Sequence, residues 1–142
     1  MTMEDEKKDT LIRYRLEQAK EAIDDAVFLF DNNRGLRSVV NRIYYGMFYA
    51  VLALLVREPF RGSKHSGVIG YFNKRFMKEG IFPPEIGKYL NMAFEARQES
   101  DYKEFSELTT ENVEELLKHA KAFIEEVSTY LKGLSSKHSD NV

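Results

Sequence analysis

Residues 41–56 read NRIYYGMFYAVLALLV, and this stretch decides the fold. From Ile43 to Val56 it runs for fourteen residues without a charge. A membrane span needs about twenty apolar residues, so a run of this length is typical of a buried core helix. Because the stretch is apolar almost all the way round the helix, we expect it to be surrounded by other helices.

One stripe of this helix departs from the apolar pattern. Side chains three and four residues apart share a helix face, which places Arg42, Tyr45, Gly46, Tyr49 and Ala53 on one line. Glycine in a helix interior costs about 1 kcal/mol relative to alanine, so Gly46 predicts a close approach by another backbone, a partner chain or a ligand. A guanidinium beside two phenols on an apolar helix is the first candidate for a functional surface.

The composition is typical of one soluble domain. The chain has 142 residues, of which 43% are apolar and 31% charged, with a formal net charge of -2 and no cysteine. This length predicts a single domain over residues 1–142, and the missing cysteines exclude disulfides and thiolate metal sites. The charge gives no overall attraction to nucleic acid, so any such binding needs a local patch. Without a signal peptide or a bilayer-spanning segment, we expect a soluble cytoplasmic protein that does not enter a membrane.

Apolar residues recur at helical spacing through most of the chain, and no strand-like alternation occurs. Residues 1–8 and 134–142 are charged or polar without this pattern, so we expect frayed tails there. The predicted fold class is all-α, an antiparallel up-down bundle of four to five helices. The expected helices cover residues 9–31, 36–57, a shorter segment that starts near residue 65 and ends at Gly80, a segment opened by Pro83 and Pro84, and residues 110–133.

A second polar group lies further along the chain, in the segment RQESDY at residues 97–102. Arg97 and Asp101 are four residues apart, the spacing of a helix-face ion pair worth about 0.3–0.5 kcal/mol. The other interpretation is that Arg97, Asp101 and Tyr102 form a polar cluster that meets the Arg42 stripe. The three histidines lack ligand spacing, and neither a phosphate-binding glycine loop nor a nucleophile elbow occurs. We therefore expect no metal and no cofactor.

Three segments in order resemble the HEPN domain, the higher eukaryote and prokaryote nucleotide-binding domain. They are NRIYYGMFYA at 41–50, KHSGVIGYFNKRF at 64–76 and FEARQESDY at 94–102. The resemblance covers nearly the whole chain and implies an antiparallel bundle of about four helices, in agreement with the helical pattern. Members of this family often act as metal-independent ribonucleases. Many are toxins paired with a small nucleotidyltransferase antitoxin, and the sites of two chains meet at a homodimer interface.

The family signature is an arginine, a polar residue and, a few residues later on the same helix, a histidine. The resemblance places the arginine on Arg42, the polar neighbour on Asn41 and the histidine position on Tyr49. An imidazole exchanges a proton near neutral pH, whereas a phenol, with a reference pKa of about 10, is a poor general base. The ribonuclease motif is thus degenerate, with Arg42 and Tyr49 as its candidate catalytic residues. His65 could swing in from the following loop, but we do not place it in the site.

The leading hypothesis is a HEPN-type domain that homodimerises through the stripe and binds nucleotide or RNA phosphate there. It would partner a separate minimal nucleotidyltransferase in a toxin–antitoxin-like pair, and a tyrosine of the stripe could accept a nucleotide from that enzyme. The planar fork of Arg42 suits a phosphate. Two alternatives stay open: an active metal-independent ribonuclease, and a structural interaction module in which Arg42 pairs with a carboxylate such as Asp101. The candidate binding residues are Asn41, Arg42, Tyr45, Tyr49, Arg97, Asp101 and Tyr102.

Overall fold

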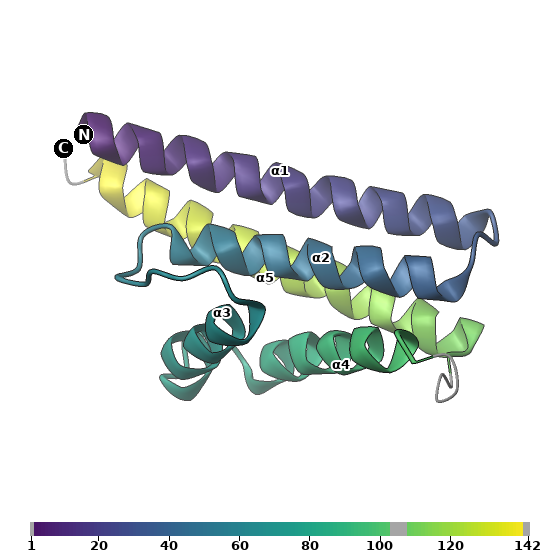
Figure 1. The fold of residues 1–142 in the computed structure, drawn as a ribbon. Coiled ribbons are helices and arrows are strands. Elements are labelled where there is room, and N and C mark those ends of the chain that lie inside the picture. The colour runs from purple at the N-terminus through teal and green to yellow at the C-terminus, as the bar shows by residue number, and fades with distance from the viewer. Residues whose placement is uncertain (1, 103–107, 141–142) are drawn as a thin grey trace.

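The structure is a computed structural model that describes residues 2–102 and 108–140, with side chains up to residue 134. Within these ranges no β-strand occurs, so the all-α prediction is confirmed. In Figure 1, α1, α2, α4 and α5 alternate in direction, as expected of helices joined by short connections. The elements are α1 (Met3–Asp31), α2 (Leu36–Leu55), α3 (His65–Phe72), a short π-helix η1 (Asn73–Lys78), α4 (Pro84–Ser100) and α5 (Thr110–Asp140).

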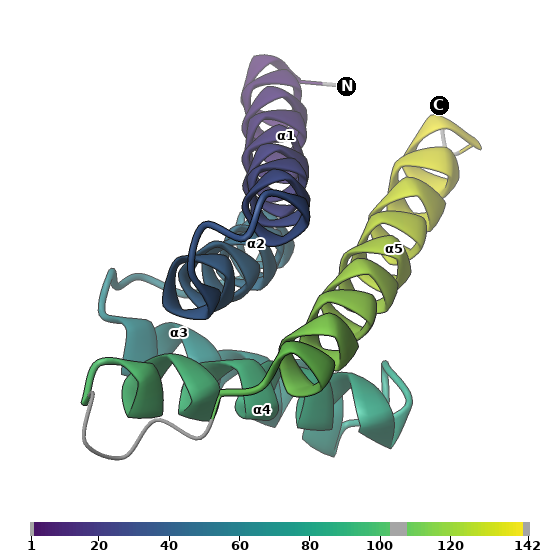
Figure 2. The same ribbon diagram turned by 90° about the vertical axis from the view of Figure 1, so that its right-hand side faces the viewer.

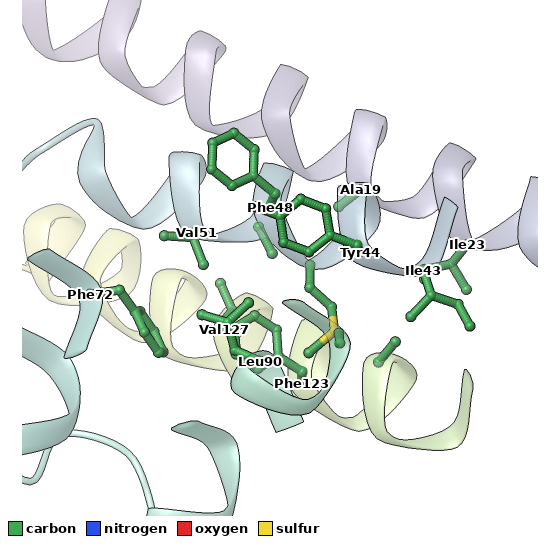
Figure 3. Packing of buried hydrophobic residues seen from close by; sticks show 14 of the residues in the cluster. Ala19, Ile23, Ile43, Tyr44, Phe48, Val51, Phe72, Leu90, Phe123 and Val127 are labelled. Carbon is green, nitrogen blue, oxygen red and sulfur yellow. The ribbon is translucent and has the colours of Figure 1, made fainter. Parts of the chain in front are cut away.

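The central helix of the bundle is α2. It contacts α1 on one side and α3 and α4 on the other, and α5 packs against it as well (Figure 2). In the described part of the chain it is the one helix long and apolar enough to cross a membrane, but 67% of that stretch is buried inside the protein. Its apolar side chains form the core with residues of α3, α4 and α5 (Figure 3): Ile43, Tyr44, Phe48, Val51, Phe72, Leu90, Phe123 and Val127.

Gly46 marks the place where α1 and α2 approach most tightly. A Cβ atom at this position would lie 2.8 Å from Cδ1 of Ile23 and 3.3 Å from the backbone oxygen of Ala19. The close approach that the sequence predicted is therefore made by α1 of the same chain. Ala53 is also fully buried. Because each residue turns a helix by about 100°, Gly46 and Ala53 lie at the edge of the stripe, and only Arg42, Tyr45 and Tyr49 remain partly exposed.

Both ends of the chain are more helical than the sequence predicted. The first helix begins at Met3 instead of residue 9, because Thr2 and Asp5 form a capping box in which each side chain accepts from the other's backbone N–H. Arg57, just beyond α2, forms ion pairs with Asp5 and Asp9 and so ties this charged turn to the bundle. At the other end, α5 continues past Gly133 to Asp140. The helices thus extend over residues 3–8 and 134–140 of the predicted tails, while residues 1, 141 and 142 of those tails lie outside the described residues.

The connections follow the turn chemistry of the sequence. Asn33 and Gly35 adopt left-handed backbone angles, with φ of 52° and 103°, and reverse the chain between α1 and α2. Pro84 opens α4, and the hydroxyl of Thr109 accepts from the backbone N–H of Asn112 at 3.1 Å to cap α5. The connection after α2 returns along that helix, so the first residue of α3, His65, lies against α2 side chains.

Candidate functional site

The ring of Tyr45, half-buried on α2, is the centre of the candidate site. The guanidinium carbon of Arg42, from the same helix, lies 5.3 Å from the ring centroid, and that of Arg97, from α4, lies 5.2 Å from it. Arg97 also donates from Nη2 to the Tyr45 hydroxyl at 3.4 Å. Two cationic groups from two helices thus meet on one phenol, at a distance typical of cation–π contacts.

Neither of these arginines has a carboxylate partner among residues 2–102 and the described part of α5. Arg42 donates from Nε and Nη2 to the side-chain oxygen of Asn41, at 3.2 Å and 3.0 Å, and this amide is neutral. Asp101 forms its ion pair with Arg37 instead, at 3.3 Å. Both the helix-face pair with Arg97 and the pairing of Arg42 with Asp101 are therefore wrong predictions. The reason is that Arg97 lies over the rings of Tyr44 and Tyr45, while Asp101 pairs with Arg37 at the start of α2.

The orientation of the two guanidiniums suits them to an anion. A guanidinium that stacks on a ring keeps its N–H groups in its own plane, where they can donate to phosphate or carboxylate oxygens. Asn41 holds two N–H groups of Arg42, and the Tyr45 hydroxyl holds one of Arg97. The remaining donors have no carboxylate to bind in the described chain, so the site carries two positive charges that an incoming anion would neutralise.

The structure adds a residue that the sequence did not place in the site. Nδ1 of His65 lies 3.0 Å from the hydroxyl of Tyr44. The imidazole stacks on Phe48 with centroids 4.1 Å apart and meets the ring of Tyr45 edge-on at 5.7 Å. The available signal was the pair Tyr44 and Phe48, which lie one helical turn apart and together form a platform for a planar ring.

The electrostatic environment sets the protonation of this pair. Burial raises the pKa of the Tyr44 phenol to about 12, so the hydroxyl keeps its proton at neutral pH. Burial also lowers the pKa of His65 below its ordinary value of 6.5, and the nearby charge of Arg97 lowers it further. At pH 7 the imidazole is therefore uncharged, and the positive charge of the site comes from the arginines.

A polar surface cleft of about 550 Å³ adjoins this cluster, between the start of α2 and the end of α4. Asn41 and Arg42 line it from α2, and Arg37 and Asp101 lie across its rim. Tyr49 lies one turn further along α2, with its ring 6.0 Å from that of Tyr45.

The predicted site residues divide into three groups. The structure brings Arg42, Tyr45, Tyr49 and Arg97 together, with Asn41 holding Arg42. Asp101 lines the adjoining cleft and also shares a second surface hollow with Arg97 and Tyr102. Tyr102 is 66% exposed beside Arg97 in a separate surface hollow.

A model of one known family, the HEPN domain, matches residues 12–131. The chain belongs to the HEPN domain family. A UPF0332 protein of Thermotoga maritima is 42% identical over 127 residues, which cover 89% of this chain and 96% of that protein. Two proteins of Methanocaldococcus jannaschii, both named "putative toxin", are 34% and 31% identical. The alignments cover 89% and 85% of this chain, and 86% and 89% of those proteins.

In this HEPN domain, Arg42, which the resemblance places at the arginine of the family signature, lies over Tyr45 and lines the cleft. The resemblance assigns the histidine position of the signature to Tyr49, and the imidazole of His65 from α3 contacts Tyr44, Tyr45 and Phe48. The site thus contains an arginine pair, a group of phenols and one neutral imidazole, contributed by α2, α3 and α4.

Proposed function

We propose that this HEPN domain binds the phosphate of a nucleotide or RNA at Arg42 and Arg97, in the cleft of a homodimer. It works in the cytoplasm with a separate minimal nucleotidyltransferase, as a toxin–antitoxin-like pair. The observation that carries the proposal is that both guanidiniums meet on Tyr45 with no carboxylate partner in the described chain. The names of two relatives support the toxin–antitoxin context.

A phosphate is the anion that fits these donors best. Guanidinium and phosphate form paired, charge-assisted hydrogen bonds that are about twice as strong as neutral ones. Arg42 and Arg97 are both partly buried against tyrosine rings, which lowers the local dielectric and strengthens the attraction. The half-buried phenols of Tyr45 and Tyr49 add flat surfaces on which a base can stack. Charge and stacking together favour a nucleotide or single-stranded RNA.

The outer face of α2 supports the homodimer. Tyr45, Tyr49, Leu52 and Val56 follow one another at three- and four-residue spacing, and each stays partly exposed after the other helices have packed. A second copy that packs on the Leu52 and Val56 end of this face would bury these two side chains, leave the tyrosines at the edge of the interface and bring a second Arg42 to the same cleft. Each phosphate would then meet arginines from two chains, which raises the affinity without any change in the fold.

The experiment is a binding titration with labelled single-stranded RNA and with nucleotides, combined with sedimentation to measure the dimer. Arg42→Ala and Arg97→Ala should each weaken binding at least about tenfold, as expected for loss of a charge-assisted hydrogen bond. Arg13→Ala, an exposed arginine on α1, removes the same charge away from the site and should have little effect. Unchanged binding in both site variants would remove the assignment. Metal-independent RNA cleavage by the unmodified protein in chelator would instead establish an active ribonuclease.

A further inference from the structure

The phenol of Tyr44 needs an acceptor for its proton. Its side chain is fully buried, and a buried hydroxyl without an acceptor costs the free energy of its lost hydration. The polar groups next to it are Nδ1 of His65, at 3.0 Å, and the guanidinium of Arg97, whose carbon lies 4.8 Å from the ring centroid. A guanidinium can only donate. The Tyr44 hydroxyl therefore donates to Nδ1 of His65.

This hydrogen bond fixes the tautomer of the imidazole. A neutral imidazole carries one N–H, and when Nδ1 accepts, the proton is on Nε2. The opposite tautomer would have Nδ1 donate to Tyr44, and the buried phenol proton would then have no acceptor among its described neighbours. His65 thus presents an uncharged N–H, and no free lone pair, on the side of the ring away from Tyr44.

The ring is held rigidly while this N–H stays available. Phe48 stacks on the imidazole, and Tyr45 meets it edge-on, so the plane of the ring is set by α2. No hydrogen bond of Nε2 is found in the described chain. Among the fully buried side-chain nitrogen and oxygen atoms of that part, the one without a partner is Nδ1 of His119, so Nε2 of the half-buried His65 keeps some contact with solvent. A fixed donor on the tyrosine pair that Arg97 covers is suited to a ligand held by that arginine.

We propose that His65 is a ligand-contacting residue of this site, whose Nε2–H donates to an oxygen of the bound phosphate group, and that Tyr44 is the positioning residue that fixes its tautomer. The inference rests on the proposed function, because the ligand is the one assigned to Arg42 and Arg97. His65 adds a directional donor without adding charge. It also has no unprotonated nitrogen facing the ligand, so in this state it does not replace the base that the motif lacks at Tyr49.

Three substitutions of His65 separate the donor from the rest of the ring. His65→Gln keeps an amide N–H near the position of Nε2, His65→Asn keeps one near Nδ1, and His65→Ala keeps neither. Affinity for a labelled single-stranded RNA should stay within about threefold in the glutamine variant and fall about tenfold in the other two, as for loss of a single hydrogen bond. Ser66→Ala, the exposed neighbour, is the matched control. Thermal unfolding checks that each variant is folded.

The tautomer itself is measured without any ligand. Long-range proton–nitrogen correlation spectra of protein labelled at histidine should show Nε2 protonated and Nδ1 unprotonated in the unmodified chain, and a mixture in Tyr44→Phe. A proton on Nδ1, or an equal affinity of all three His65 variants and the unmodified protein, would overturn the proposal. If Arg42→Ala loses binding while His65→Ala does not, the contact between His65 and the phosphate is contradicted and the proposed function is kept. If the unmodified protein binds neither RNA nor nucleotide, both the role of His65 and the proposed function are contradicted.

Discussion

Arg42, Tyr45 and Tyr49 could be placed together from the sequence because they lie on one helix, where spacing alone decides which side chains are neighbours. The contact of His65 with this group depends on the path of the chain between α2 and α3, and the spacing of residues in the sequence does not predict that path. For Asp101 the sequence predicted a contact that the structure does not contain. Its spacing from Arg97 is right for a helix-face pair, but Arg97 contacts the tyrosines of α2 and Asp101 pairs with Arg37, and helix spacing does not predict these contacts between elements.

Asp101 now stands as a negative charge on the rim of the cleft, paired with Arg37. Both side chains are more than half exposed, so their ion pair contributes about 1 kcal/mol or less to the free energy of unfolding. The carboxylate would repel an incoming phosphate. Asp101→Asn should therefore leave the melting temperature nearly unchanged and raise the affinity for RNA about two- to fivefold. Glu85→Gln, at the other end of α4, is the control, and weaker binding of Asp101→Asn would show that Asp101 supports the ligand.

The resemblance to the family signature assigns its histidine position to Tyr49, whose ring lies 6.0 Å from that of Tyr45. An imidazole at this place could accept a proton near neutral pH, and general base catalysis contributes about 10²–10⁴-fold to a rate. Tyr49→His should therefore cleave RNA in chelator at least about a hundredfold faster than the unmodified protein, and the double variant with Arg42→Ala should lose that gain. Equal cleavage by the unmodified protein would mean that the histidine is not needed.

At the scale of elements, the sequence defined helix interiors better than helix ends. The interiors carry apolar residues at helical spacing, which burial against α2 enforces. The first turn of α1 has no such residues, and it is held by the Thr2 capping box and by ion pairs from Arg57, which joins two segments far apart in the sequence. Contacts of that kind leave no periodic signal.

The tight contact between α1 and α2 gives a prediction at this scale. Gly46→Ala gains about 1 kcal/mol of helix propensity. Its new Cβ would meet Cδ1 of Ile23 at 2.8 Å and the backbone oxygen of Ala19 at 3.3 Å, and overpacking of this kind costs about 1–3 kcal/mol. We expect the free energy of unfolding, measured with denaturant, to fall by about 1 kcal/mol.

Two further variants test the cause of this loss. Ile23→Val removes the atom nearest to the new Cβ, so the double variant with Gly46→Ala should lose less stability than the two single changes predict together. Gly70→Ala in α3 has nothing within 4 Å of its new Cβ and should keep or raise stability. If Gly46→Ala and Gly70→Ala change the free energy of unfolding by the same amount, the loss at position 46 does not come from the contact between α1 and α2.

For the whole molecule, the aromatic cluster that joins α3 and α4 to α2 makes stability depend on pH. Burial, and then the charge of Arg97, lower the pKa of His65 below 6.5 in the folded chain, while the unfolded chain keeps the ordinary value. Between these two pKa values the unfolded chain binds more protons than the folded one. The contribution of the uncharged His65 to the free energy of unfolding is therefore fully present above about pH 6.5. This contribution is lost as the pH falls from that value through the lower pKa of the folded chain.

His65→Gln isolates this contribution, because the carboxylates and the other histidines titrate alike in both proteins. The unmodified protein should exceed the variant in free energy of unfolding most clearly at about pH 7.5, since there the neutral imidazole packs between Phe48 and the tyrosines. The difference should shrink as the pH falls below about 6.5, because the unfolded chain then binds a proton that burial and Arg97 keep from His65 in the folded chain. Denaturant titrations across this range measure it. A difference that stays constant with pH would mean that His65 titrates in the folded protein as it does in the unfolded chain, and that neither burial nor Arg97 acts on it.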